Sequence, residues 1–100
     1  MVHILVESND IAEFDDFMQI SSEPGIDVIH EKSFNGITNL IEIFIDAIPV
    51  IAVISPIIIE KIKKKNISKI KIDGDKIEIE NISEELLKEI IEKKFLENGD

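Results

Sequence analysis

The sequence of 100 residues contains no cysteine and no arginine, and its four glycines stand apart from one another. Without cysteine the chain can form no disulfide, thiolate nucleophile or zinc–cysteine site, so a reducing compartment, the cytoplasm, is the expected location. Isolated glycines provide no loop that could cradle phosphate groups. No serine lies in the strand-to-helix context of a hydrolase nucleophile. These absences predict a protein that is not an enzyme and needs no cofactor.

Acidic residues outnumber basic ones, and the formal net charge at pH 7 is −10. The charge is unevenly spread, with a net −9 over residues 1–59, a net +4 over 60–76 and a net −5 over 77–100. An acidic surface repels the phosphates of nucleic acids and attracts basic partners. The basic segment contains lysines but no interleaved aromatic residues, so nucleic acid is not an expected partner.

Length and composition indicate one globular domain over residues 1–100, because 44% of the residues are hydrophobic and 32% are charged. Short β-branched or alternating runs predict strands over 2–8 and 26–33. The run ISKIKIDGDKIEIEN predicts a hairpin that turns at Asp73–Asp75. Lysines on its first strand should face glutamates on its second, which favours pairing.

Helical spacing of apolar residues predicts three helices. The first covers 10–20, and the last follows Ser83, whose side chain can cap it. Between them, a central helix begins near Ile37 and is kinked at Pro49. The predicted order is therefore β-α-β-α-β-β-α, an α+β fold with a four-stranded sheet and three helices on one face.

The central segment is unusually apolar, and every residue from Val50 to Ile54 is hydrophobic. One small sheet cannot cover all sides of such a helix, so we expect a second copy or another protein to cover the remainder. An alternative is that residues 43–59 span a membrane. Such a span would be at the short limit of length and would bury the charge of Asp46 in the bilayer. A strand over 50–54 is another.

The interface interpretation assigns partner binding to two groups of side chains. The apolar side chains of the central helix would dock against the partner, and the acids of the first helix would form a rim that selects its orientation. The apolar group is Phe44, Ile48, Ile51, Ile54 and Ile58, and the acidic rim is Glu13, Asp15 and Asp16.

The two histidines, His3 and His30, fall on predicted strands and could approach each other if those strands pair. With Glu7 or Glu31 they would then resemble a metal site. No spacing typical of metal ligands supports this, and we expect partly buried histidines and no metal. The DGD turn lacks the further ligands and the twelfth-position glutamate of a calcium loop.

Nearly the whole chain resembles the effector-associated constant component family of bacterial conflict systems. The resemblance lies in the strand ILVES, the turn EPGI, the glycine-led apolar segment GITNLIEIFIDAIPVIAVI, its basic end EKIKKK, the hairpin IKIDGDKIEIEN and the helix SEELLKEII. Pro49 and Pro56 depart from the less interrupted, alanine-rich helix of that family. The resemblance implies a small non-catalytic partner of an effector or protease module.

These observations together predict a cytoplasmic, non-enzymatic protein–protein interaction module. It would act as an adaptor or accessory component of a defence system, docking through the central helix onto an effector or protease module or a second copy of itself. The alternative is a small acidic inhibitor, encoded by a phage or plasmid, that blocks a basic nucleic-acid-binding groove.

Overall fold

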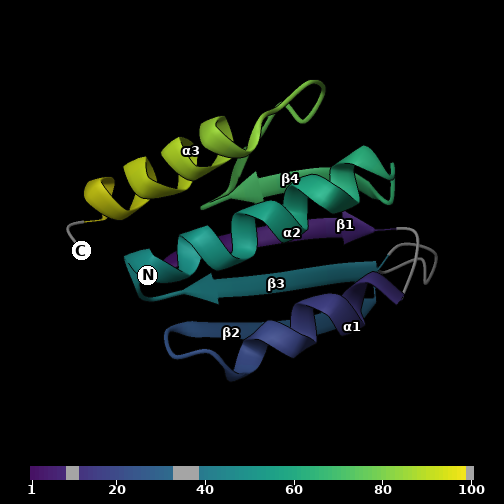
Figure 1. Cartoon of the computed structure of the whole chain (residues 1–100), viewed down its shortest axis with the longest axis horizontal. Helices are drawn as coiled ribbons and strands as arrows, with labels where there is room; N and C mark the ends of the chain where they lie inside the picture. Colours follow the sequence, from purple (N-terminus) through teal and green to yellow (C-terminus); the bar gives the residue numbers. More distant parts are fainter. Residues whose placement is uncertain (9–11, 33–38, 99–100) are drawn as a thin grey trace.

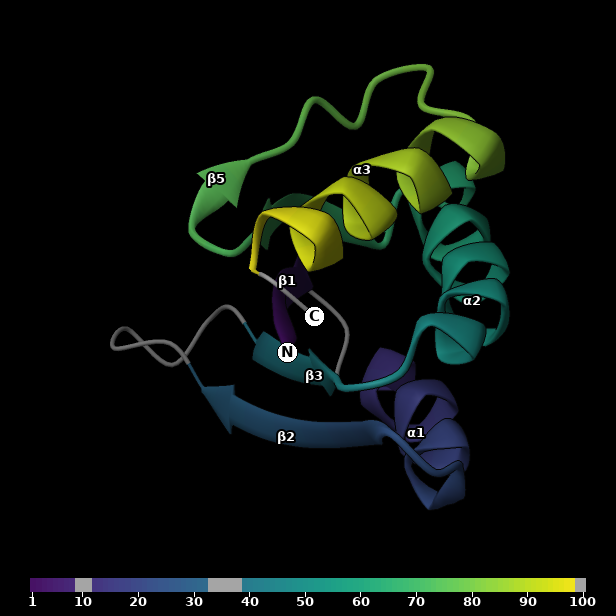
Figure 2. The ribbon, with the colours of Figure 1, turned by 90° about the vertical axis from the view of Figure 1, so that its left-hand side faces the viewer.

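The computed structural model contains a single sheet with helices on one face (Figures 1 and 2). It describes residues 1–8, 12–32 and 39–98, without the side chains of residues 12–14 and 32. The predicted α+β class is confirmed. The strands are β1 (Val2–Ser8), β2 (Ile26–Lys32), β3 (Asn39–Ile45), β4 (Ile67–Ile72) and β5 (Asp75–Lys76). The helices are α1 (Ala12–Gln19), α2 (Ile51–Lys63) and α3 (Glu84–Glu97), with 3₁₀ turns at Ile20–Ser22 and Ile48–Val50.

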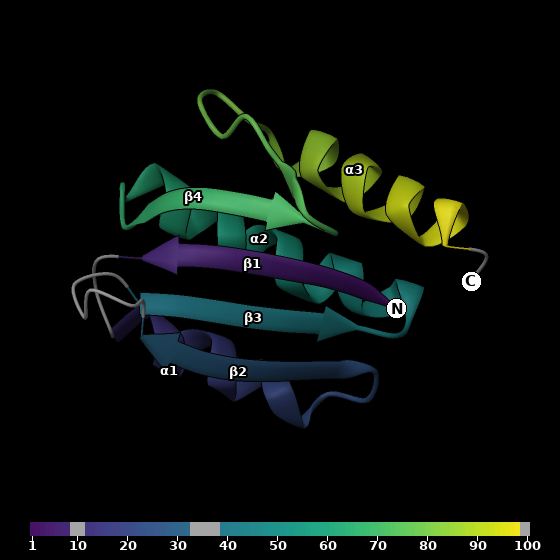
Figure 3. The ribbon, with the colours of Figure 1, turned by 180° about the vertical axis from the view of Figure 1, so that it is seen from behind.

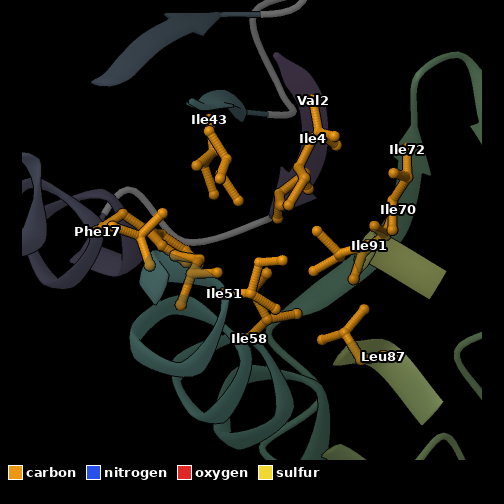
Figure 4. Packing of buried hydrophobic residues seen from close by; sticks show 14 of the residues in the cluster. Val2, Ile4, Phe17, Ile43, Ile51, Ile58, Ile70, Ile72, Leu87 and Ile91 are labelled. Atoms are coloured by element: carbon orange, nitrogen blue, oxygen red, sulfur yellow. The ribbon is translucent and has the colours of Figure 1, made fainter. Parts of the chain in front are cut away.

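The sheet has five strands in the order β2-β3-β1-β4-β5, and every neighbouring pair is antiparallel. The prediction of four strands in a different order is therefore wrong. β1 lies in the middle, and β3 separates it from β2. Alternate side chains of β1 and β3 are fully buried on the helix side. Their isoleucines form the core with α2 and α3, as Figure 4 shows for Ile4, Ile43, Ile58 and Ile91.

The first half of the predicted central helix is instead strand β3. Residues 37 and 38 lie outside the described residues, and Asn39–Ile45 pairs with β1 on one side and β2 on the other. A strand here supplies hydrogen bonds to two neighbours at once, which a helix could not do. Its isoleucines occupy every second position, so all of them reach the core from a pleated strand.

Pro49 lies in the 3₁₀ turn before α2 and does not kink a helix, which corrects the predicted break. Pro56 is the proline inside α2. It is exposed, so water can reach the carbonyl group that its missing N–H leaves without a helical partner. The segment 50–54 expected as an alternative strand is helical from Ile51 onward.

The predicted hairpin turn is confirmed between β4 and β5, where Asp73 has φ 51° and Gly74 has φ 87°. Positive φ at both central residues is the geometry that matches strand twist in a two-residue turn. The predicted lysine–glutamate pairing is wrong, because Lys71 lies opposite Lys76. The N–H of Ile77 still donates to the carbonyl oxygen of Ile70 at 2.9 Å, and the chain then leaves the sheet.

The helix termini follow the sequence closely where they are described. The Oγ of Ser83 accepts a hydrogen bond from the N–H of Leu86 at 3.1 Å, which confirms the predicted cap of α3. Leu87, Ile91 and Phe95 form the buried stripe of this helix. The predicted start of the first helix, residues 9–11, lies outside the described residues. None of the helices within the described ranges has the length and apolarity needed to cross a bilayer.

Candidate interaction surface

The apolar side of α2 faces the core of its own chain. Ile51 is 1% exposed, and Ile54 and Ile58 are 0% exposed. These three residues were predicted to dock against a partner, and in this fold they cannot reach one. The sheet together with two flanking helices covers them, so the expectation that α2 needs a partner to bury it is corrected.

α2 is enclosed because it lies across the sheet between α1 and α3 (Figures 1 and 2). Lys63 is exposed in the last turn of α2. Before that turn, the exposed residues are the least apolar part of the helix surface, namely Ala52, Pro56 and Glu60. These positions are four residues apart and therefore share one side of the helix. The sequence predicts a segment that is apolar on every side. In the structure, Ala52, Pro56 and Glu60 occupy the side of α2 that no other described element covers.

Two of the predicted apolar residues remain at the surface. Ile48 is 50% exposed in the turn between β3 and α2. Phe44 lies on β3, is partly exposed, and alternates with the buried Ile43 and Ile45. By this alternation its ring points to the side of the sheet that carries no helix. The structure thus separates Phe44 from Ile51, Ile54 and Ile58.

The predicted acidic rim is likewise divided. Asp16 forms an ion pair with Lys61 of α2, whose side chain is only 5% exposed. This pair joins α1 to α2 and compensates for the burial of the ammonium group. Asp15 is exposed on α1. The side chain of Glu13 lies outside the described residues.

None of the described helices covers the opposite side of the sheet, which faces the viewer in Figure 3. We call this surface the open face. It consists of the alternate side chains of β1 to β4 that point away from the helices. They are Asp27, Ile29 and Glu31 on β2, Leu40, Glu42 and Phe44 on β3, His3, Leu5 and Glu7 on β1, and Lys69 and Lys71 on β4.

Cross-strand contacts order the centre of the open face. The Nε2 atom of His3 lies 3.0 Å from Oε1 of Glu42, and the Nζ atom of Lys69 lies 3.5 Å from Oε2 of Glu7. The rings of His3 and Phe44 are 4.9 Å apart at their centroids. Such pairs hold side chains in fixed positions on a sheet. The open face is therefore an ordered surface on which apolar and paired charged groups alternate.

The histidines do not form a metal site. β3 lies between the strands that carry His3 and His30, and the Nε2 atom of His30 lies 3.0 Å from Oδ1 of Asn39. Within residues 1–8, 12–32 and 39–98, no group of three histidine, cysteine or acidic side chains is placed to hold a metal ion.

A cleft of ≈ 660 Å³ lies where the chain leaves the sheet after β5. The predicted hairpin would have closed this space by continuing its second strand along β4. The cleft carries both lysines and glutamates, so it has no consistent charge for recognising an ion. Its lining residues are Ile62, Lys63, Lys65, Ile67, Glu78, Ile79, Glu80, Asn81 and Ile82.

Lys94 of α3 contacts Asp75 at the hairpin turn, at the opposite end of β4 from Ile67 and this cleft. The hydrogen bond from Lys94 lowers the pKa of the Asp75 carboxyl group, and the same bond raises the pKa of Lys94. Asn98 also donates a hydrogen bond to Oδ2 of Asp73 at 3.0 Å. These contacts fix the end of α3 to the turn and have a structural role.

Comparison of the chain with models of protein families, with curated proteins and with solved structures gives no match.

Proposed function

We propose that this chain is a non-enzymatic protein-interaction module that docks through its open face. The observation that carries the proposal is the division of the sheet. All three described helices lie on one face (Figures 2 and 3), and the other face carries partly exposed apolar side chains and cross-strand charged pairs. The original docking hypothesis used the central helix, and the burial of its isoleucines moves the surface to the open face.

The character of the open face favours a protein partner. Protein interfaces combine partly exposed apolar side chains with charged groups at their margins. Leu5, Leu40 and Phe44 supply the apolar part, and Glu42 and Glu7 lie between them in pairs with His3 and Lys69. Small-molecule sites are concave, whereas an antiparallel sheet face offers a broad, shallow surface.

The size of the open face sets a limit on how it can bind. Four strands of about seven residues, at roughly 4.8 Å between strands and 3.4 Å per residue, give a footprint of roughly 450 Å². A stable interface of standard size buries about 800 Å² on each partner. A partner that binds here must also contact neighbouring parts of the molecule, or bind transiently.

The resemblance to the effector-associated constant component family supports a specific context for the module. We propose a cytoplasmic accessory component of a bacterial conflict system, whose partner is an effector or protease module encoded beside it. The overall charge of −10 favours a basic surface on that partner.

The proposal is tested by measuring the binding of this chain to each protein encoded next to its gene, by calorimetry. Leu5→Asp and Phe44→Asp place a charge on the open face and should each raise the Kd at least about tenfold. Leu96→Asp is the matched control, because Leu96 is 74% exposed on α3, away from the open face.

Circular dichroism should show all three variants folded. The docking proposal would be overturned if Phe44→Asp and Leu5→Asp bound as tightly as the unmodified chain, or if Leu96→Asp abolished binding. Absence of binding to any neighbouring gene product would overturn the conflict-system context.

A further inference from the structure

The two edges of the sheet are built differently. β5 has two residues, and the chain turns away after the N–H of Ile77 has donated to the carbonyl oxygen of Ile70, so little backbone is available there for pairing. β2 has seven residues, and all of them pair in unbroken register with β3. Among the described strands none lies beyond β2, which forms the lower border of the sheet in Figures 1 and 3. Natural proteins usually shorten, bulge or cover such an edge.

The hydrogen bonding of β2 shows which of its backbone groups point outward. The N–H of Asp46, at the end of β3, donates to the carbonyl oxygen of Gly25 at 2.7 Å. Because backbone direction alternates along an antiparallel strand, Asp27, Ile29 and Glu31 also direct their N–H and C=O groups at β3. Ile26 and Val28 direct theirs outward, where a further strand could bind them.

The side chains along this edge define what such a strand would carry. Ile29 is 46% exposed, and the exposed carboxylates of Asp27 and Glu31 lie on either side of it on the open face. No described basic side chain forms an ion pair with either carboxylate. An added strand places its alternate side chains about 4.5–5.5 Å from these three residues.

We propose that the β2 edge binds an extended, antiparallel segment of another protein that carries basic side chains opposite Asp27 and Glu31 and an apolar side chain opposite Ile29. Main-chain hydrogen bonds to Ile26 and Val28 supply affinity, and the two carboxylates select the sequence, as in strand addition generally. The β2 edge shares Asp27, Ile29 and Glu31 with the open face. Strand addition uses the outward backbone groups of β2, however, and does not depend on docking through Leu5 and Phe44.

A second copy of this chain fits the edge poorly. If two β2 strands pair around a two-fold axis perpendicular to the sheet, the side chains of directly opposite residues point to the same side of the sheet. The register centred on Ile29 places Asp27 against Glu31 of the other copy, which is repulsive. If the register is centred on Val28 instead, Asp27 lies opposite Ile29 of the other copy. If it is centred on His30, Glu31 lies opposite Ile29. In none of these registers does Asp27 or Glu31 lie opposite a basic side chain.

Amide hydrogen exchange followed by NMR tests the proposal on the full chain. The probe is a blocked peptide, Thr-Lys-Thr-Val-Val-Lys-Thr, which places lysines opposite Asp27 and Glu31 in antiparallel register. In the free protein the amides of Ile26 and Val28 should exchange faster than those of Asp27 and Ile29. Saturating peptide should slow exchange at Ile26 and Val28 at least about tenfold, because those amides become hydrogen-bonded.

Two controls isolate the charges. The same peptide with glutamate in place of both lysines should bind at least about tenfold more weakly. The variant Asp27→Lys/Glu31→Lys should weaken binding of the lysine peptide to the same extent. Glu85→Lys/Glu89→Lys changes the net charge equally on the exposed surface of α3 and should alter the Kd less than about twofold.

Three results would overturn the proposal. The first is no binding of the lysine peptide, or binding that leaves exchange at Ile26 and Val28 unchanged. The second is equal binding by the charge-reversed edge variant. The third is slowed exchange at Ile26 and Val28 when the protein is concentrated without peptide, which would make a second copy the occupant of the edge.

Discussion

The two faces of the sheet arise from the same strands, and adjacent residues on one strand have opposite roles. On β3, Ile43 is 0% exposed under α2, whereas its neighbour Phe44 is partly exposed beside His3. On β1, Ile4 is 0% exposed and Leu5 lies on the open face. The helix side is almost entirely isoleucine, valine and leucine, while the open face mixes apolar residues with paired charges.

This difference separates stability from recognition. The helix side buries most of its apolar residues within one chain, so changes there should alter the free energy of unfolding. The open face and the β2 edge hold groups whose packing is incomplete in the monomer, so changes there should mainly alter binding.

Replacing Ile54 with aspartate should unfold the chain. Ile54 is 0% exposed on α2, and an unpaired carboxylate there would lose its hydration and leave a gap in the core. The cost should exceed about 4 kcal/mol, a large part of the about 5–15 kcal/mol that stabilises a typical domain. Circular dichroism and thermal unfolding measure it.

Phe44→Asp is the control for Ile54→Asp, because it places the same charge on the open face. It should keep a cooperative unfolding transition. If Ile54→Asp also unfolded cooperatively with an unchanged Tm, the enclosure of α2 by its own chain would be wrong.

Truncation on a single strand should measure the same difference more gently. Ile43→Ala removes fully buried methyl groups and should lower the free energy of unfolding by about 3 kcal/mol. Leu40→Ala, on the partly exposed face of β3, should lower it by about 1 kcal/mol. Urea denaturation compares the two, and equal losses would contradict the division between the faces.

The sequence predicted those parts of the fold that one local pattern specifies. The strand at Val2–Ser8, the turn at Asp73–Asp75 and the cap at Ser83 each depend on residues close in sequence. β3 could not be predicted in this way, because Leu40 and Phe44 fit the spacing of a helix as well as that of a strand. The choice is made by tertiary context, since β1 needs a neighbour on each edge.

The candidate surface was missed for the same reason. With a helix expected near Ile37–Ile48, Phe44 was grouped with Ile51 and Ile54, which lie on the opposite side of the sheet. The signal for a strand was present in the alternation of Asn39, Ile41, Ile43 and Ile45, all of which are buried. Leu5 and Leu40 could have been assigned to the open face only once that alternation was preferred.

Two glycines with the same backbone angle test how closely the ends of the sheet are packed. Gly25 and Gly74 both have φ +87°, so alanine should cost about 1 kcal/mol at either from backbone strain alone. At Gly25 an added Cβ would lie 2.8 Å from the Cβ of Ala47, whereas nothing lies within 4 Å at Gly74.

Gly25→Ala should therefore lower the free energy of unfolding by about 2–3 kcal/mol and Gly74→Ala by about 1 kcal/mol. Both values come from urea denaturation. Equal losses for Gly25→Ala and Gly74→Ala would show that the contact between the start of β2 and the end of β3 relaxes without cost.

The smallest expected effect concerns a polar group on the helix side. Ser55 is 0% exposed on α2, and its Oγ has no hydrogen-bond partner among the described residues. A buried hydroxyl without a partner is destabilising, so Ser55→Ala should raise the free energy of unfolding by about 1 kcal/mol. Ser68→Ala changes an exposed serine of β4 and should leave the free energy of unfolding within about 0.5 kcal/mol. Lower stability for Ser55→Ala would mean that the hydroxyl does form a hydrogen bond, and that the covered face needs one polar contact to pack α2.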